Sequence, residues 1–353
     1  MLAGMTYTAA VSGATGYAGG EVLRLLAGHP EITVSTVTGH STAGQRLGAL
    51  QPHLRALADM EVVETTPKNL SGHDIVFLAL PHGQSAEIAA QLPENTVVVD
   101  AGADHRLESS EAWGAFYDGD HAGHWPYGLP ELIIDPSGAK QRQKLVGATR
   151  IAVPGCYPTG SLLALAPAVA AGLVKTRDIV IVSASGTSGA GKASKPHLLG
   201  AEVMGSMSPY GVGGGHRHTP EIEQGLGWAS GQDVSISFTP TLAPMPRGIL
   251  TTATAPLADG TTFESALKAY QDAYADEPFI HVLPQGQWPT TKSVVGSNHV
   301  TLQLAVDAHA NRLIVSVVLD NLTKGTAGGA VQSVNIALGL DETTGLQLQG
   351  LAP

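Results

Sequence analysis

Cysteine is almost absent from this chain: its 353 residues include one, Cys156. A single thiol cannot form an intramolecular disulfide, so a disulfide scaffold is excluded and a reducing cytoplasm is the expected location. Positive charge is also scarce. The net charge is −11, and no cluster of Lys or Arg interrupts the acidic balance. This composition argues against a nucleic-acid partner.

Long apolar runs are missing as well. The longest, Leu162 to Val174, contains Pro167 and is too short to cross a bilayer, so we expect no membrane partner. The first basic residue is Arg24, so the N-terminus lacks the basic region of a signal peptide. Met1 and Met5 both remain open as the start of the protein.

The first half of the chain alternates strand-like and helix-like segments. A helical pattern over 21–26 ends at Gly28 and Pro30. The expected strands cover residues 7–12, 32–37, 75–80 and 96–99. Strands separated by helices predict right-handed βαβ units, and hence an α/β fold with a Rossmann-type parallel sheet.

From Asp178 onward the expected strands follow one another with few obvious helices between them. They cover residues 180–183, 234–238, 249–253, 301–306 and 313–318. They predict a second, α+β domain with a mixed or antiparallel sheet, one face of which is available for subunit contacts in a homo-oligomer, a dimer or tetramer. The Ala-rich tail over 326–338 is expected to be a helix that returns to the first domain.

These patterns divide the chain at its middle. We assign residues 1–155 to a dinucleotide-binding domain, completed by the C-terminal helix within 325–353. Residues 156–324 form the predicted catalytic, substrate and oligomerisation domain.

A glycine-rich turn, Gly13 to Gly20, follows the first expected strand and opens the first helix. In this context glycines let the backbone approach a dinucleotide pyrophosphate, and the helix N-terminus offers N–H donors. The spacing is G-x-x-G-x-x-G, and a turn needed only for helix–strand packing is the alternative. The expected cofactor contacts are Gly13, Thr15, Gly16, Tyr17, Ala18 and Gly19.

The second strand ends without the carboxylate that would bind a ribose 2′-hydroxyl. Ser41 and Thr42 follow it, and Arg46 is nearby. Hydroxyl donors and a cation suit a 2′-phosphate, so the sequence favours NADPH/NADP over NADH.

Cys156 lies on a Gly/Pro-rich turn between an apolar run and the long apolar segment from Ser161 to Val174. The order strand, turn, helix places the sulfur at or near a helix N-terminus, where the helix dipole and the N–H groups favour the thiolate. We interpret Cys156 as a nucleophile rather than an inert core residue.

The segment Gly186 to Lys192 fits the P-loop pattern G-x-x-x-x-G-K, but Ala193 stands where Ser or Thr is needed to bind Mg²⁺. A P-loop ATPase or kinase is therefore disfavoured, and the loop suits a smaller anion. Arg106, just past a strand's carboxyl end, is expected to bind a carboxylate or phosphate or to form a structural ion pair.

The segment His216 to Glu221 has the spacing H-x-H-x-x-E after a glycine-rich stretch. A metal site is disfavoured because the sequence has no further ligand motif, and because Pro220 is expected to break the helical register of this segment. Two histidines without a chemical role are a second alternative. The preferred hypothesis is a histidine beside the thiol that acts as acid and base.

Several motifs together cover nearly the whole chain and resemble those of the N-acetyl-γ-glutamyl-phosphate reductases of arginine biosynthesis. Pro154–Thr159 (P-G-C-Y-P-T) and His216–Glu221 (H-R-H-T-P-E) are the most specific. The others are Gly13–Gly20, Phe77–Gly83, Trp125–Glu131, Ser185–Gly191 and Asp320–Gly328.

This resemblance implies an NADP-dependent oxidoreductase that acts on an aldehyde group and releases phosphate. It would reduce an acyl phosphate to N-acetylglutamate 5-semialdehyde through a Cys156 thioester, with backbone N–H groups of the turn stabilising oxyanions. His218 is the expected proton carrier and His216 the alternative, while Glu221 would orient the imidazole.

The resemblance also implies the remaining site residues. Further cofactor contacts are expected at Gly186, Ser188, Gly189, Asn321, Lys324 and Gly325, and substrate contacts at Arg106, Ser185 and Lys192. A related acyl-phosphate reductase, such as an aspartate-semialdehyde dehydrogenase or a carrier-bound aminoadipyl-phosphate reductase, is the alternative function. A non-catalytic dinucleotide-binding regulator is a further one. No metal is expected.

Overall fold

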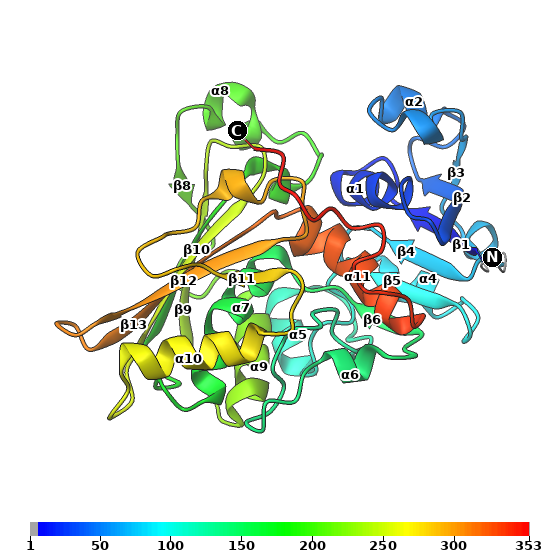
Figure 1. The fold of residues 1–353 in the computed structure, drawn as a ribbon. Coiled ribbons are helices and arrows are strands. Elements are labelled where there is room, and N and C mark those ends of the chain that lie inside the picture. Colours follow the sequence, from blue (N-terminus) through cyan, green and yellow to red (C-terminus); the bar gives the residue numbers. More distant parts are fainter. Residues whose placement is uncertain (1–5, 353) are drawn as a thin grey trace. The chain divides into compact units, whose positions relative to one another are not determined.

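The computed structural model describes residues 6–352, so Met1 and Met5 lie outside the described residues. The chain forms two compact units (Figure 1). Unit 1 contains the chain up to Gly128 together with Lys144–Pro154 and Thr326–Gln347. Unit 2 contains Leu129–Gln143, Gly155–Gly325 and the chain from Leu348. Among residues 6–352, no helix has the length and apolar character needed to span a membrane.

Unit 1 is built on a six-stranded sheet in the order β3-β2-β1-β4-β5-β6, with every pairing parallel. Its strands are β1 (Tyr7–Ser12), β2 (Ile32–Gly39), β3 (Val62–Glu64), β4 (Ile75–Leu78), β5 (Val97–Asp100) and β6 (Arg150–Ala152). The order reverses between β1 and β4, which is the switch point where Rossmann-type sheets bind dinucleotides. The predicted parallel sheet is confirmed.

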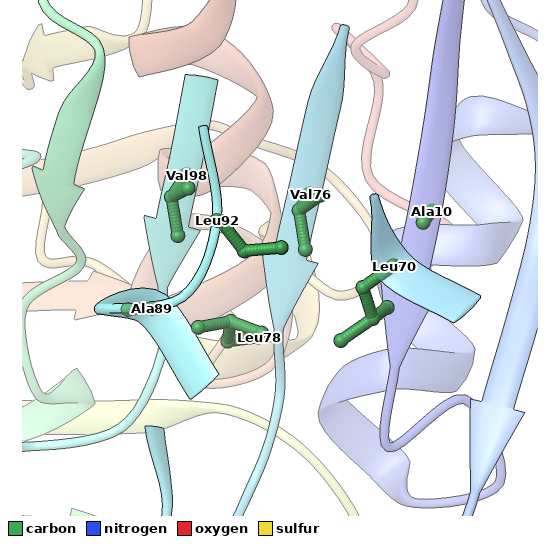
Figure 2. Close-up of a cluster of buried hydrophobic side chains, with 7 residues drawn as sticks. All are labelled: Ala10, Leu70, Val76, Leu78, Ala89, Leu92 and Val98. Carbon is green, nitrogen blue, oxygen red and sulfur yellow. The ribbon is translucent and has the colours of Figure 1, made fainter. Parts of the chain in front are cut away.

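Unit 1 also contains short helices. They are α1 (Tyr17–Leu26), α2 (Leu47–Leu50), α3 (Pro67–Leu70), α4 (Ser85–Ala89), α5 (Ser110–Phe116) and α11 (Gly328–Ala337), together with a 3₁₀ turn at Arg55–Leu57. The chain passes from unit 2 to unit 1 within α6 (Arg142–Leu145). Figure 2 shows Leu70 of α3 and Ala89 of α4 against Val76 and Leu78 of β4, which are buried on one face of the sheet. The predicted C-terminal helix forms as α11 and contacts α1 and β5 within unit 1.

Unit 2 contains a seven-stranded mixed sheet in the order β11-β12-β13-β10-β7-β9-β8. Its strands are β7 (Ile179–Ser185), β8 (Ser208–Pro209), β9 (Ile236–Leu242), β10 (Ile249–Pro256), β11 (Ile280–Val282), β12 (Val300–Asp307) and β13 (Arg312–Leu319). The pairs β7/β9 and β11/β12 are parallel and the others are antiparallel. The predicted second domain with a mixed sheet is thereby confirmed.

The helices of unit 2 are more extensive than the sequence indicated. They are α7 (Cys156–Ala170), α8 (Gly200–Val203), α9 (Thr219–Ser230) and α10 (Phe263–Tyr274), with 3₁₀ turns at Thr187–Ala190, Pro196–Leu198 and Thr291–Ser293 and a π-helical turn, η5, at Thr323–Ala327. The expectation of few helices between the strands was wrong for α9 and α10. A capping box of Thr262 and Ser265 begins α10, and Gly231 ends α9 with a φ of +64°.

A proline inside α7 has a compensating partner in α10. Pro167 has no N–H, so the carbonyl of Leu163 loses its regular helical donor. The Tyr274 hydroxyl donates a hydrogen bond to this carbonyl at 2.7 Å. The Tyr270 hydroxyl donates likewise to the carbonyl of Ala164. The long apolar helix that begins at Cys156 therefore remains continuous and is anchored along α10.

We expect Tyr274→Phe to lower the free energy of unfolding by about 1–3 kcal/mol, because it leaves a buried carbonyl without a donor. Tyr270→Phe is the matched control and should cost less, since the Ala164 carbonyl retains Ala168 N–H as its regular helical donor. Urea denaturation of both variants measures the difference. An equal or larger loss for Tyr270→Phe would contradict this account of Pro167.

The segment Leu129–Gln143 belongs to unit 2, whereas the sequence boundary assigned residues 1–155 to the first domain. The buried carboxylate of Glu277, beyond the end of α10, explains this difference. It forms ion pairs of 2.5 Å with both Lys140 and Arg142. These contacts join chain segments more than a hundred residues apart, which no local pattern reveals.

Candidate active site

Cys156 is the first residue of α7, and Gly155 is its N-cap in an extended conformation. The first amide bonded within this helix is that of Thr159, which donates to the Gly155 carbonyl at 2.9 Å. Pro158 has no N–H. The amides of Cys156 and Tyr157 are therefore N–H groups that the helix itself does not use, at the positive end of the helix dipole where Cys156 lies.

The imidazole of His218 lies directly against this turn. A Cβ atom placed on Gly155 would come within 2.6 Å of His218 Nε2 and 2.7 Å of Cε1. His218 is only 7% exposed and is the N-cap of α9, with Pro220 in the first turn. Pro220 therefore begins a helix, and the expectation that it would break one was wrong, because proline suits the first turn. The structure brings the predicted nucleophile's turn and the predicted proton carrier together.

Glu221 is buried in the first turn of α9, and its Oε1 accepts a hydrogen bond of 2.8 Å from the Gly155 N–H. This bond joins the start of α9 to the start of α7. Among residues 6–352, no three His, Cys, Asp or Glu side chains are arranged to bind a metal ion.

Aromatic rings surround the two histidines. The Tyr157 ring lies edge-on to His216 and His218, with centroids 5.7 and 5.9 Å away, and its hydroxyl is 2.8 Å from that of Tyr210. Burial, together with the neighbouring Tyr210 and Cys156, raises the pKa of Tyr157 well above its usual value. Ser185, predicted to bind substrate, also forms a hydrogen bond with Tyr157. Tyr157 and Tyr210 are site residues that the sequence analysis missed.

The His216 ring is held in its neutral form. Burial, and then the adjacent Arg217, lowers the pKa of His216 to about 4. Its Nδ1 accepts a hydrogen bond of 3.1 Å from the backbone N–H of His218, which places the proton of the neutral ring on Nε2. A group with this pKa is poorly matched to proton transfer near neutral pH.

This pKa predicts an acid-dependent loss of stability. The unfolded value is about 6.5, so between that pH and 4 the unfolded state binds more protons at residue 216 and stability falls as the pH falls. The loss from this residue amounts to at most about 3 kcal/mol. We expect His216→Asn to remove it, so that the variant loses less stability than the parent between pH 6.5 and 4 in urea denaturation. If the stability of the parent and of the variant fell equally over this pH range, the burial of a neutral His216 ring would be contradicted.

The predicted loop after β7 forms a single 3₁₀ turn, Thr187–Ala190, rather than the long helix that follows a P-loop. Asn321 joins it to the neighbouring backbone, since its Nδ2 donates to Ser188 Oγ and its Oδ1 accepts from Gly248 N–H. A Cβ on Gly186 would lie 2.7 Å from the backbone nitrogen of Arg247, so this glycine is required by packing. Lys192, beyond the turn, is exposed.

Lys324 and Gly325 lie in the π-helical turn η5. The Lys324 side chain is fully buried and forms an ion pair of 2.6 Å with Glu131. A Cβ on Gly325 would lie 2.9 Å from the Cβ of Cys156.

The predicted cofactor turn in unit 1 has the geometry that a pyrophosphate needs. Gly16 is the N-cap of α1 without a side-chain cap, so backbone N–H groups face outward at the helix start. A Cβ on Gly13 would lie 2.1 Å from the Ala79 oxygen, and one on Gly19 would lie 2.2 Å from the Gly13 oxygen. These two glycines allow the close turn, and Tyr17 beside them is 42% exposed.

The end of β2 lies next to this turn. The Thr15 and Thr42 hydroxyls are 3.4 Å apart, and Ser41 and Arg46 are exposed. Arg46 Nη1 donates to the Asp59 carbonyl. Arg106 is in the same unit but is buried, and it donates to the Ala101 carbonyl at 2.8 Å.

Comparison with known proteins agrees with this arrangement. N-acetyl-gamma-glutamyl-phosphate reductases from Paenarthrobacter aurescens and Pseudarthrobacter chlorophenolicus are 69% and 70% identical to this chain, each over 349 residues that cover 99% of it and 100% of the relative. The chain belongs to this reductase family. A relative with the same name from Streptomyces coelicolor is 64% identical over the same share of both chains.

Two broader families match the two halves of the chain. The semialdehyde dehydrogenase NAD-binding domain matches residues 8–137, and the semialdehyde dehydrogenase dimerisation domain matches residues 156–321. The protein is thus an oxidoreductase that uses a nicotinamide dinucleotide and acts on a small molecule. Aspartate semialdehyde dehydrogenase II from Vibrio cholerae shares the fold, with a TM-score of 0.69 at 16% identity over 95% of this chain and 99% of that one.

Proposed function

We propose that this protein reduces N-acetyl-γ-glutamyl phosphate to N-acetylglutamate 5-semialdehyde and releases phosphate, as a step of arginine biosynthesis in the cytoplasm. The observation that supports this most strongly is the contact between the Cys156 turn and the His218 imidazole, within a chain nearly 70% identical to reductases of that name. The identity over full length favours this substrate over that of the more distant aspartate-semialdehyde dehydrogenases.

Each protein group has a distinct chemical task in this proposal. The Cys156 thiolate attacks the acyl carbon, the C–O bond to phosphate breaks, and an acyl thioester remains on the sulfur. The amides of Cys156 and Tyr157 donate to the carbonyl oxygen as negative charge develops on it. NADPH, when bound, supplies the hydride that reduces the acyl group.

His218 is the proposed proton carrier because its Nε2 lies beside the turn that contains the nucleophile. It takes the thiol proton before attack and returns a proton as the aldehyde is released. Glu221 acts as a positioning residue through the Gly155 N–H, in addition to its predicted influence on the imidazole. Arg106, Ser185 and Lys192 remain proposed contacts of the substrate carboxylate or phosphate.

The reverse reaction tests the function. Purified protein should reduce NADP⁺ with N-acetylglutamate semialdehyde only when inorganic phosphate is present, followed by absorbance of the reduced cofactor. Aspartate semialdehyde is the control substrate and should react far more slowly. A preference for aspartate semialdehyde would favour the alternative reductase, and no reaction with either would favour a non-catalytic dinucleotide-binding protein.

The cofactor proposal is NADPH, because Ser41, Thr42 and Arg46 lie at the end of β2 in place of a carboxylate. We expect NADPH to bind at least about tenfold more tightly than NADH, a difference of about 1.4 kcal/mol. Arg46→Ala should weaken NADPH without affecting NADH, and Arg55→Ala, another exposed arginine, should affect neither. Titration calorimetry measures the six affinities, of three proteins for two cofactors, and equal affinities of the parent protein for NADPH and NADH would overturn the argument.

The oligomerisation proposal concerns unit 2. Ile181 and Ser183 of β7 are buried, whereas the side chain of Val182 between them is 44% exposed. Together with the match to a dimerisation domain, this supports a homo-oligomer, a dimer or tetramer, formed through this sheet face.

A further inference from the structure

The ion pair between Lys324 and Glu131 is the most deeply buried one among the described residues of unit 2. Both side chains have no exposed surface, and Nζ lies 2.6 Å from Oε1. The Lys324 ammonium also lies 5.7 Å from the centroid of the buried Phe279 ring. The pair joins the segment Leu129–Gln143 to the turn η5, almost two hundred residues later in the chain.

A buried ion pair is a poor source of stability. The loss of hydration of the two charges offsets most of their attraction, and well-packed apolar residues often stabilise a protein as much. The pair instead provides geometric specificity, because a short, charged hydrogen bond fixes the position of the backbone segments that carry its two side chains.

The backbone that bears Lys324 lies against the nucleophile. Gly325, the next residue, has its Cα so close to Cys156 that an added Cβ would come within 2.9 Å of the Cys156 Cβ. The same atom would lie 3.2 Å from Leu319 Cδ1. The turn is also π-helical, a rare conformation that is frequent at functional sites.

Two anchors hold the start of the turn. At its start, the buried Asp320 carboxylate accepts hydrogen bonds from the Leu322 and Thr323 amides and forms an ion pair of 2.9 Å with Arg247. One residue further, Lys324 is held by Glu131. The two anchors leave Gly325 little freedom to move away from Cys156.

We propose that the Lys324–Glu131 ion pair positions the Cys156 thiol, because it holds the π-helical turn whose Gly325 backbone packs against that residue. Lys324 thus acts through Gly325 and not by touching the reactants. The inference rests on the proposed function only in that Cys156 is the nucleophile. It assigns a role to a charged pair in which the sequence predicted a cofactor contact at Lys324 alone.

The experiment measures the alkylation rate of Cys156, the chain's one cysteine, by iodoacetamide as a function of pH. This readout does not depend on turnover. Lys324→Met and the double variant Glu131→Gln/Lys324→Met both break the ion pair, and only the first leaves the buried Glu131 carboxylate charged without its lysine partner. Lys268→Met is the matched control, since it removes a lysine from an exposed ion pair of 2.7 Å with Asp272.

We expect the double variant to unfold at nearly the parent's temperature. Its Cys156 should nevertheless be alkylated at least about threefold more slowly than the parent's at pH 7, with the pH midpoint of the reaction shifted toward that of free cysteine. Lys268→Met should alkylate like the parent. If the double variant regains both stability and the parent's alkylation profile, the pair is only structural and the proposal is overturned. This holds even where Lys324→Met fails to fold.

Gly325→Ala tests the same contact from the other side. Its Cβ would collide with Cys156, so the alkylation profile should change in the same direction. Gly114→Ala, in α5 with open space around the added Cβ, is the control and should match the parent. An unchanged profile in Gly325→Ala would also overturn the proposal. An absence of reductase activity in a parent protein with these alkylation results would instead count against the proposed function alone.

Discussion

Replacing Cys156 with serine is expected to abolish the reductase activity, by at least about 10⁴-fold. A serine hydroxyl at the start of α7 is scarcely ionised near neutral pH, and the helix N-terminus that favours a thiolate cannot overcome this difference. Serine would also form an ester, which is less reactive than a thioester toward hydride. Both phosphate release and aldehyde formation should therefore disappear, as measured by phosphate detection and by absorbance of NADPH.

The same variant should bind NADPH with the parent's affinity, because the predicted cofactor turn lies in unit 1. Calorimetric titration provides this control and separates a lost nucleophile from a misfolded protein. Residual phosphate release at more than about a hundredth of the parent's rate would show that Cys156 is not the acyl acceptor.

The second large effect is expected from His218→Asn, which should lower kcat by about 10²–10⁴-fold and weaken its pH dependence. The nucleophile remains in this variant, so slow turnover should persist. His216→Asn should cost less, because a ring whose pKa is near 4 and whose Nδ1 accepts the His218 N–H is already neutral and is poorly matched to proton transfer near neutral pH. Steady-state rates of both variants between pH 5 and 9 give the comparison.

Which of the two histidine variants loses more activity decides which histidine is assigned as the proton carrier. A larger loss in His216→Asn would make His216 the proton carrier, and parent-like rates in both variants would reduce the H-R-H motif to a structural role. In either case the thioester chemistry of Cys156 would be left intact.

Local sequence patterns predicted the parts of the fold that depend on short-range physics. The turn from Gly13 to Gly20 follows β1 and opens α1, and Cys156 begins α7 as the apolar run after a Gly/Pro turn indicated. Strand positions in both sheets were also close, because alternating or continuous apolar residues mark buried strands. The capping pattern of Thr262 and Ser265 was available in the sequence and could have revealed α10.

The contacts that depend on long-range packing were not predictable in this way. The Tyr157–Tyr210 hydrogen bond joins the residue after the predicted nucleophile to the residue that directly follows the distant strand β8, and no sequence motif pairs these two residues. Lys324 was predicted as a cofactor contact, and no local pattern pairs it with Glu131, with which it forms a buried ion pair. The charge of a residue indicates which ligands it is able to bind, whereas the fold determines which groups lie within its reach.

Gly155 has a consequence for how this site can evolve or be redesigned. The space that a side chain at position 155 needs is occupied by the His218 imidazole. A larger residue at 155 becomes tolerable only after 218 has changed, and a change at 218 removes the proposed proton carrier first. Neither single step leads through a functional intermediate, so the effects of the two substitutions should be strongly non-additive. A mutant library that alters the neighbour of the nucleophile must therefore vary both positions in the same clone.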